Sequence, residues 1–403
     1  MSAQWLRDYI QLSFRIDKVF HIVAEMPFVD YYYGPPEWKA KLEQEAAQEP
    51  LELVQAATAL LEVLPAQNFD QHRTTHLSKQ VLAMQTVCRK LNGEAFSFAE
   101  ELQHIFDVQF AWVPETQLEE GLELYNETLP GKGTLADRLH SWRIQYQLPL
   151  DKRKNDRVPA VVERLMTEIR RRTQEFVTLP NGEGIDLQLE MDGPFGGACW
   201  YQGNYRSRIE VNLAAYGQGH INMLVDALCH EVYPGHHTAS ALKEQHLYRE
   251  NKYTEECIGL IFSPGAVIGE GIATSACAML FSPQELEQWL AEHVYPELGI
   301  EAMEEDVTKL QRAFDLLEGV WGNVAVMLRE KRPHVEIEAY TAKYMHRANI
   351  AFWEQPFHDF FPAIEYYGRN LVRPHLEGAE RQHMFRRLLM EQVYPSELVR
   401  STN

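Results

Sequence analysis

The spacing of apolar residues changes along this chain of 403 residues, and this change limits the fold more than any other feature. Residues 51–64 and 158–176 place apolar side chains at helical spacing with charged residues between them, a pattern that dominates residues 1–180. Residues 185–191 and 206–213 instead alternate between apolar and polar, as half-buried strands do. Helical spacing then returns and continues to the end. The pattern predicts a mainly α fold.

The domain organisation follows from the same pattern. The chain contains no low-complexity segment and no evident linker, so we expect one mainly helical domain over residues 1–403. It would comprise a helical N-terminal half (1–180), a small antiparallel β-sheet (181–215) and a second helical half (216–403). The clearest strand, 206–213, directly precedes a histidine-rich segment, so we expect the sheet to lie beside the helix that carries those histidines.

Charge and cysteine content exclude several classes of protein. The formal net charge of -20 repels phosphate backbones, so we expect no nucleic-acid partner. The most apolar stretch, 265–281, carries Glu270 in its middle, and we expect no membrane span. The N-terminus lacks the basic and apolar regions of a secretory signal. Five scattered cysteines, none in a CxxC pair, favour free thiols and a cytoplasmic location.

The histidine-rich segment carries the chemistry. Residues 230–237 are His-Glu-Val-Tyr-Pro-Gly-His-His. A helical His-Glu-x-x-His sequence places two histidines one turn apart, where both can bind one zinc ion while the glutamate faces the metal-bound water. Here His230-Glu231 supplies the first half, but Pro234 occupies the place of the second histidine. The alternative interpretation is a surface His-Glu pair followed by two histidines at a helix end.

A shared metal therefore requires a break in the helix. In an unbroken helix His237 would lie about 10 Å along the axis from His230, too far for two nitrogens that are each about 2.0 Å from one zinc ion. Pro234 and Gly235 supply the break, because proline removes a helical donor and glycine adopts angles that other residues avoid. If they bulge outward, His236 takes the place of the second ligand; His237 is the alternative.

A third ligand is expected because catalytic zinc sites commonly have three protein ligands. Glu270 is the only charged residue between Cys257 and Gln284, where an isolated carboxylate would be costly unless a cation offset its burial. The alternative for Glu270 is a helix-capping role. The other downstream candidates lie among basic residues, as on a solvated helix face; they are Glu244, Glu250, Glu255 and Glu256.

In the segment at residues 230–237, the chain resembles a bacterial family of uncharacterised zinc metallopeptidases that carry the pattern His-Glu-x-x-Pro-Gly-His-His. That family is grouped with the gluzincins, which include the thimet oligopeptidase and carboxypeptidase Taq types. Further matches are Gly-Glu-Gly at 269–271, Pro-Ala-Ile-Glu-Tyr-Tyr-Gly at 362–368 and the strand at 205–213, so the resemblance covers about residues 190–370.

The resemblance implies a role for each matched residue. The zinc ligands would be His230, His236 and Glu270, and Glu231 would be the general base. A tyrosine near the end of the chain would stabilise the oxyanion. Adjacent helical residues point about 100° apart, so only one of Tyr366 and Tyr367 can face the metal. Tyr366 is our first choice; if neither acts, His334 and His346 come next.

The predicted function is a zinc-dependent hydrolase, a metallopeptidase of the carboxypeptidase or oligopeptidase type, acting on a peptide or small amide. A zinc-bound water would attack the carbonyl while Glu231 transfers its proton to the leaving amine. An extended peptide would pair with the 206–213 strand, and Arg206, Arg208 or Arg369 would bind its carboxylate. The alternatives are a hydrolase of a non-peptide amide and a catalytically inactive helical protein with a structural zinc ion.

Overall fold

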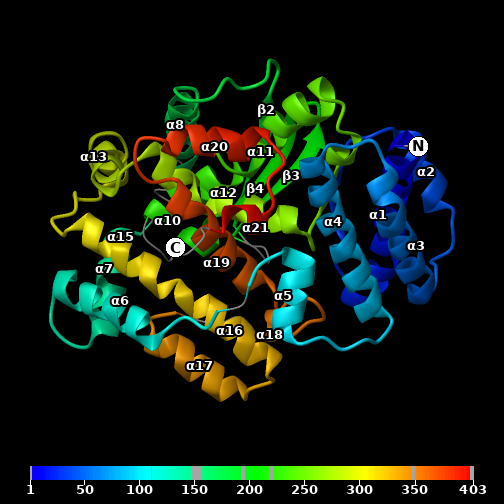
Figure 1. Cartoon of the computed structure of the whole chain (residues 1–403). Helices are drawn as coiled ribbons and strands as arrows, with labels where there is room; N and C mark the ends of the chain where they lie inside the picture. The colour runs from blue at the N-terminus through cyan, green and yellow to red at the C-terminus, as the bar shows by residue number, and fades with distance from the viewer. Residues whose placement is uncertain are drawn as a thin grey trace.

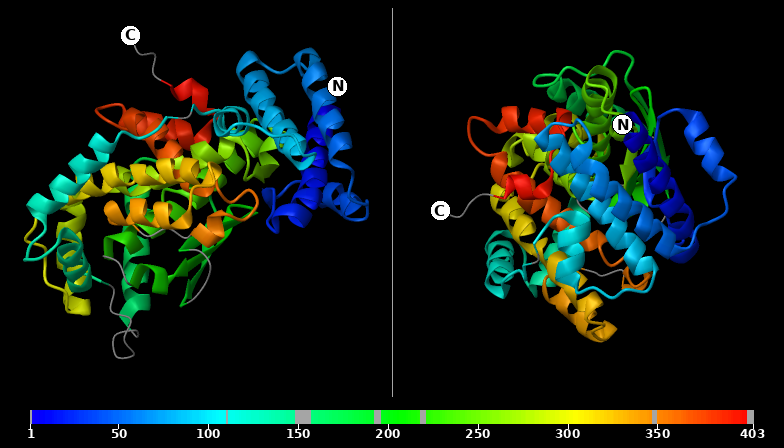
Figure 2. Two further views of the ribbon diagram at one scale, coloured as in Figure 1. Left: turned by 90° about the horizontal axis from the view of Figure 1, so that it is seen from below. Right: turned by 45° about the vertical axis from the view of Figure 1, so that its right-hand side comes forward.

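A computed structural model describes residues 2–109, 111–147, 157–191, 196–217, 221–346 and 350–399. The expected mainly α fold is confirmed: helices surround a small amount of sheet (Figures 1 and 2). The N-terminal half contains α1 (Ser2–Ala24), α2 (Pro36–Glu43), α3 (Pro50–Val63), η1 (Leu64–Ala66), α4 (Gln71–Leu91), α5 (Phe98–Phe106), α6 (Glu115–Thr128), α7 (Leu135–Gln145) and α8 (Val158–Thr173). The predicted helical segments 51–64 and 158–176 thus correspond to α3 and α8.

The second half begins beside the sheet and is helical to its end. Its elements are α9 (Leu213–Gly217), α10 (Ile221–Glu231), α11 (His236–Lys243), the π-helical η3 (Glu244–Glu250), η4 (Thr254–Cys257), α12 (Pro264–Leu280), α13 (Pro283–His293), α14 (Tyr295–Leu298), α15 (Val307–Leu317), α16 (Gly319–Arg329), α17 (His334–Lys343), α18 (Ile350–Trp353), α19 (Phe361–Val372), η5 (Arg373–His375), α20 (Arg381–Met390) and α21 (Pro395–Leu398).

Two sheets lie within this helical frame. Strands β1 (Val29–Tyr32) and β5 (Ile258–Leu260) form an antiparallel pair that joins the N-terminal half to the second half. The other sheet has the order β2-β4-β3, where β2 is Gly184–Glu190, β3 is Gly197–Gly203 and β4 is Arg206–Asn212. Residues 185–191 and 206–213 thus form strands as the alternating pattern predicted.

The pairing within the three-stranded sheet differs from the purely antiparallel sheet that we expected. Strand β3 is antiparallel to β4, but β2 runs parallel to β4, so the sheet is mixed. Alternation specifies which face of a strand is buried and does not specify its neighbours. The expectation that a peptide would pair with β4 is wrong, because β4 is the central strand and both of its edges are already bonded.

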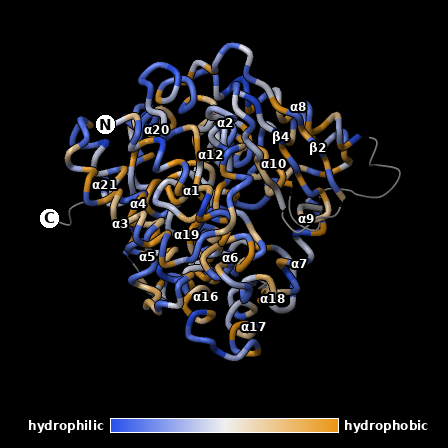
Figure 3. The backbone as a smooth tube through the Cα atoms, turned by 90° about the vertical axis from the view of Figure 1, so that its right-hand side faces the viewer, coloured by the Kyte–Doolittle hydropathy of each residue, from blue (hydrophilic) through white to orange (hydrophobic). Residues whose placement is uncertain are grey.

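Helix α12 is the centre of the packing. Its Val267 belongs to the core formed with α1, α4 and α5, while Ile268 and Ile272 belong to the core formed with α8, α10 and α20. A third core lies among α6, α7, α15 and α16. In the tube coloured by hydropathy, apolar stretches recur along helices from both halves of the chain (Figure 3). Within the described residues no single helix is both long and apolar enough to cross a membrane; α12 and α13 pass that test only as a pair bent by 66°.

The closest packing of α12 is against α19, and two glycines permit it. A methyl group on Gly271 would lie 2.5 Å from the carbonyl oxygen of Gly368, and one on Gly368 would lie 2.5 Å from that of Val267. The backbones therefore approach too closely for any side chain at the crossing. This contact brings α19 against Glu270: a Cβ at Gly368 would lie 3.3 Å from the Cβ of Glu270.

Candidate metal centre

A corner between two helices forms the histidine-rich segment. Helix α10 ends at Glu231 and α11 begins at His236, so the predicted break is confirmed; the Tyr233–Pro234 peptide within it is cis. The amide of Gly235 donates to the carbonyl of Cys229 at 3.0 Å. A methyl group on Gly235 would lie 1.8 Å from the carbonyl oxygen of His230. Only glycine fits where the chain passes this close to the end of α10.

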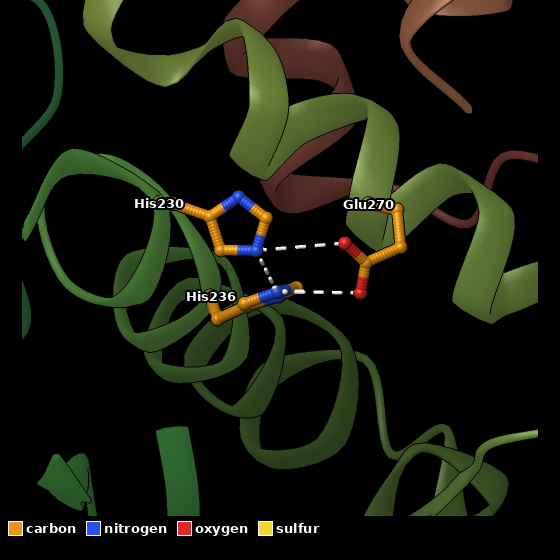
Figure 4. A group of neighbouring side chains, drawn as sticks. All are labelled: His230, His236 and Glu270. Atoms are coloured by element: carbon orange, nitrogen blue, oxygen red, sulfur yellow. Dashed lines mark hydrogen bonds and ion pairs between the residues drawn. The ribbon is translucent and has the colours of Figure 1, made fainter. Parts of the chain in front are cut away.

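The corner brings together the three expected ligands, and Figure 4 shows their side chains converging. The Nε2 atoms of His230 and His236 are 3.1 Å apart. Oε2 of Glu270 lies 3.5 Å from Nε2 of His230, and Oε1 of Glu270 lies 3.5 Å from Nε2 of His236. Two atoms bound to one tetrahedral zinc at 2.0–2.1 Å are separated by roughly 3.3 Å. The three donors therefore fit the spacing of a metal site, each contributing one ligand atom.

His237 lies outside this group of ligand atoms. Its ring is fully buried, with Nδ1 2.8 Å from the Ser207 hydroxyl on β4 and Nε2 3.1 Å from the Glu183 carboxylate. Glu183 also accepts hydrogen bonds from Tyr233 at 2.8 Å and from Arg170 at 2.9 Å. Both ring nitrogens of His237 are thus engaged with partners on the side of the sheet. Of the two candidate histidines, the geometry brings only His236 to His230 and Glu270.

Three further carboxyl groups surround the candidate ligands. Glu231 is 7% exposed, and burial raises its pKa to about 7. Burial also raises the pKa of Asp30, on β1, to about 6. Glu365, on α19, has a pKa raised to about 8 by burial, then by the charges of Glu270 and nearby carboxylates. Asp30 and Glu365 are nevertheless exposed to solvent, so they line a recess rather than the closed core. This surplus of carboxylates around two histidines suits a divalent cation.

The other glutamates that were candidate ligands have partners elsewhere. Glu244 accepts hydrogen bonds from Tyr201 and Arg249, and Glu255 is ion-paired with Arg73. The remaining two are also engaged: Glu250 is 2.9 Å from His246, and Glu256 accepts a hydrogen bond from Gln392 at 2.7 Å. Among the four, the structure brings none into the group of ligand atoms formed by the two histidines and Glu270.

The two tyrosines expected to stabilise an oxyanion have their hydroxyl groups engaged at other places. That of Tyr366 bonds to Asn370 and Gln117, and that of Tyr367 lies 3.4 Å from the backbone of Ala111. The reserve histidines are also elsewhere: His334 pairs with Glu354, and His346 packs on Trp321. The residue of α19 whose carboxyl group lies near the candidate ligands is Glu365, which was not among the predicted site residues although it immediately precedes Tyr366.

The arginines expected to bind a substrate carboxylate differ in their surroundings. Arg369 is paired with Asp315, and Arg208 lies 2.7 Å from Glu210 on the same strand. Arg206 is exposed at the start of β4. Their predicted role in substrate binding remains a prediction, and for Arg369 and Arg208 it requires a substrate to compete with an existing ion pair.

The strand nearest Glu231 is β3, which the alternation of apolar and polar residues did not predict. A methyl group on Gly197, the first residue of β3, would lie 2.8 Å from Oε1 of Glu231. The backbone amide of Asn212 donates to the carbonyl of Gly196 at 2.8 Å, and in an antiparallel pair every second residue bonds to the neighbouring strand. The residues of β3 that bond to β4 are therefore Ala198 and Trp200. The backbone groups of Gly197 and Cys199 therefore point to the outer edge of the sheet.

Comparison with known proteins gives a fold-level likeness. No family model matches the chain, and no curated protein matches it. A solved structure from Colwellia psychrerythraea, described as that of a putative lipoprotein, is similar with a TM-score of 0.52 and 15% sequence identity; the match covers 90% of this chain and 68% of that one. At this identity the likeness concerns the fold alone.

Proposed function

We propose that the protein is a zinc-dependent peptidase whose metal ligands are His230, His236 and Glu270. The observation that carries the proposal is the close grouping of one ligand atom from each residue, all within 4.8 Å of one another, with Glu231 beside them. A structural zinc site needs no general base, so the recessed carboxyl group of Glu231 favours a catalytic role over a purely structural one.

The chain's own residues account for the proton transfer. Bound zinc supplies the polarisation of the scissile carbonyl and the acidity of the attacking water. Glu231 follows His230 at the end of α10, and its carboxylate accepts the proton of that water and returns it to the leaving amine. Its pKa of about 7 when no metal is bound reflects the desolvated environment in which this exchange takes place.

The outer edge of β3 is where an extended peptide would bind. This edge begins at Gly197, in contact with Glu231, and β3 then runs alongside α11 to Tyr201, whose hydroxyl bonds to Glu244 just beyond that helix. A peptide that paired with the outward backbone groups of Gly197 and Cys199 would pass Glu231 as an added strand. A peptide backbone thus has a binding edge that a small non-peptide amide would not use.

The first test is metal content. Protein purified without chelator or metal-affinity tag should contain about one zinc ion per chain, which His230→Ala should abolish. Unchanged zinc content in His230→Ala would contradict the assignment.

The second test is activity. The wild type should cleave members of a peptide library, and Glu231→Gln should keep zinc and fold but lose nearly all hydrolysis, by several orders of magnitude. Near wild-type turnover in Glu231→Gln would exclude Glu231 as the base. Cleavage of small amides but of no peptide would instead identify a non-peptide amidase.

A further inference from the structure

One face of α11 is open to solvent while the rest of the helix is buried. His236, Ser240 and Lys243 are partly exposed, and these positions follow each other at intervals of four and three residues, which places them on one face. Every other residue of α11 is buried; these are His237, Thr238, Ala239, Ala241 and Leu242. The accessible face therefore leads from the metal centre along the helix to Lys243.

Lys243 is a cation without a direct partner. It is the only lysine or arginine in α10, α11 and α12. Within the described part of the chain its ammonium group has no ion pair or hydrogen bond, although burial lowers its pKa. Glu256, whose charge acts on Lys243, is held by Gln392 at 2.7 Å and does not reach ion-pair distance. A desolvated ammonium without a partner is a favourable binding point for an anion.

The surroundings of Lys243 include other polar groups without partners. The side chains of His76, Gln80 and Gln392 are each more than nine-tenths buried, and His76 Nδ1, Gln80 Oε1 and Gln392 Oε1 lack hydrogen-bond partners in the described structure. The charge of Lys243 lowers the pKa of His76, so these two residues are close. Buried polar atoms are rarely left unpaired, so this cluster has capacity for a bound polar group or water.

Helix α12 leads to the same cluster. Gly265, near its start, faces Gln80: a methyl group there would lie 3.2 Å from Nε2 of Gln80. Ala266, one turn before Glu270, is partly exposed, as is Glu270 itself. Accessible faces of α11 and α12 thus extend from the candidate ligands toward one polar cluster, and β3 runs beside α11 in the same direction.

We propose that Lys243 binds a carboxylate of the substrate on the leaving-group side of the scissile bond; this inference rests on the peptidase function proposed above. Lys243 lies seven positions after His236 on the helix, about 10 Å along its axis. An extended peptide covers about 3.3 Å per residue, and the lysine side chain spans part of that distance. The carboxylate then belongs to the second or third residue beyond the cleaved bond, so the enzyme removes di- or tripeptides from a free C-terminus.

Carboxyl groups on the side of the metal centre away from Lys243 support this orientation of the substrate. Asp226, one turn before His230 on α10, is exposed and bonds to Cys277, seven residues beyond Glu270 on α12. Glu365 adds a carboxyl group next to the candidate ligands. A substrate carboxylate on that side would meet other carboxyl groups, whereas at the Lys243 end it meets the unpaired ammonium group.

The experiment compares hexapeptides with a free C-terminus, the same peptides as C-terminal amides, and amides with glutamate at the second or third position beyond the cleaved bond. The zinc-loaded wild type should hydrolyse the free acids with a KM about 10- to 100-fold below that of the plain amides. Lys243→Met should remove this preference through KM, and Lys243→Arg should retain part of it. Lys309→Met, which removes an exposed charge paired with Glu127, is the matched control and should keep the full preference.

The outcomes separate the two proposals. Lys243-dependent preference for the free acid alone identifies the C-terminal carboxylate, and an equal preference for the glutamate amides identifies a side-chain carboxylate. A wild type that cleaves without regard to the carboxylate, or a folded Lys243→Met that keeps the preference, overturns the role of Lys243 but leaves the peptidase intact. If Lys243→Met unfolds, Lys243→Gln takes its place: loss of the preference with an unchanged KM for the amides decides for Lys243, and an undiminished preference decides against it. A wild type that cleaves no peptide overturns both proposals.

Discussion

Replacing Gly235 by alanine should separate metal binding from folding, because the added methyl group strikes the backbone of the metal site. That group would lie 1.8 Å from the carbonyl oxygen of His230 and 2.5 Å from that of Cys229. In real proteins a Cβ atom almost never lies within 3.0 Å of another non-bonded heavy atom. The chain must therefore move by about 1.2 Å at the corner, and the two nearest atoms are backbone, which cannot rotate away as a side chain can.

The size of this shift sets the expected effect. Ligand distances in zinc sites hold to within about 0.2 Å, and the displaced corner carries His230 on one side and His236 on the other. We expect zinc affinity to fall by more than 100-fold, beyond the 10- to 100-fold that lost supporting interactions typically cost. Overpacking should also lower the free energy of unfolding by about 1–3 kcal/mol, which a protein of this size tolerates.

The assay is competition for zinc with a chelator of known affinity, together with thermal unfolding of the zinc-free protein. Gly269→Ala is the matched control: it is a glycine in α12 beside Glu270, and a methyl group there meets nothing within 4 Å. It should retain wild-type zinc affinity and gain about 0.5–1 kcal/mol of stability, as helical Gly→Ala changes do. Wild-type zinc affinity in a folded Gly235→Ala protein would refute the reasoning.

Three further expectations concern neighbouring groups. His237→Ala should keep zinc while lowering the free energy of unfolding by about 2 kcal/mol, whereas His236→Ala should lose zinc; the reverse pattern in metal analysis would exchange their roles. Burial opposes ionisation of Glu183, but hydrogen bonds from His237 and others lower its pKa to about 2. The ionised Glu183 should therefore contribute about 3 kcal/mol to the free energy of unfolding above about pH 4.5, and this contribution should be lost as the pH falls toward 2. An acid-unfolding curve that is unchanged in Glu183→Gln would contradict this. Tyr366→Phe and Tyr367→Phe should each change kcat less than about threefold, since their hydroxyl groups are engaged elsewhere; a hundredfold fall in either would restore its predicted oxyanion role.

The sequence predicted those parts of the fold that depend on local patterns. Helical spacing located α3 and α8, and alternation located β2 and β4. It could not predict the strand order, because pairing depends on contacts between distant segments rather than on periodicity. Strand β3 was missed because glycines interrupt its alternation, and β1 and β5 were missed because each is only three or four residues long.

The sequence predicted those features of the metal centre that depend on residues close together in the chain. Pro234 and Gly235 required a corner, and the corner brings His236 to His230. Glu365 could not be selected on spacing alone, since the adjacent Tyr366 points about 100° away on the same helix and offers equally plausible chemistry. The deciding signal was Gly368, three residues after Glu365, because a glycine on that face marks where α19 approaches α12 and Glu270.

The N-terminal half is part of the candidate site, although the family resemblance did not extend to it. Strand β1 carries Asp30 beside the candidate ligands, and α4 contributes His76 and Gln80 to the cluster around Lys243. The β1–β5 pairing fixes this half to the segment that follows η4, so the residues around the proposed substrate path come from the N-terminal half and from the middle of the chain. Ligands on α10, α11 and α12 define the proposed chemistry locally, and in the proposed binding mode the length of substrate beyond the cleaved bond is set by Lys243 and the α4 residues near it. Proteins with the same histidine corner can therefore differ in substrate length when their N-terminal halves differ.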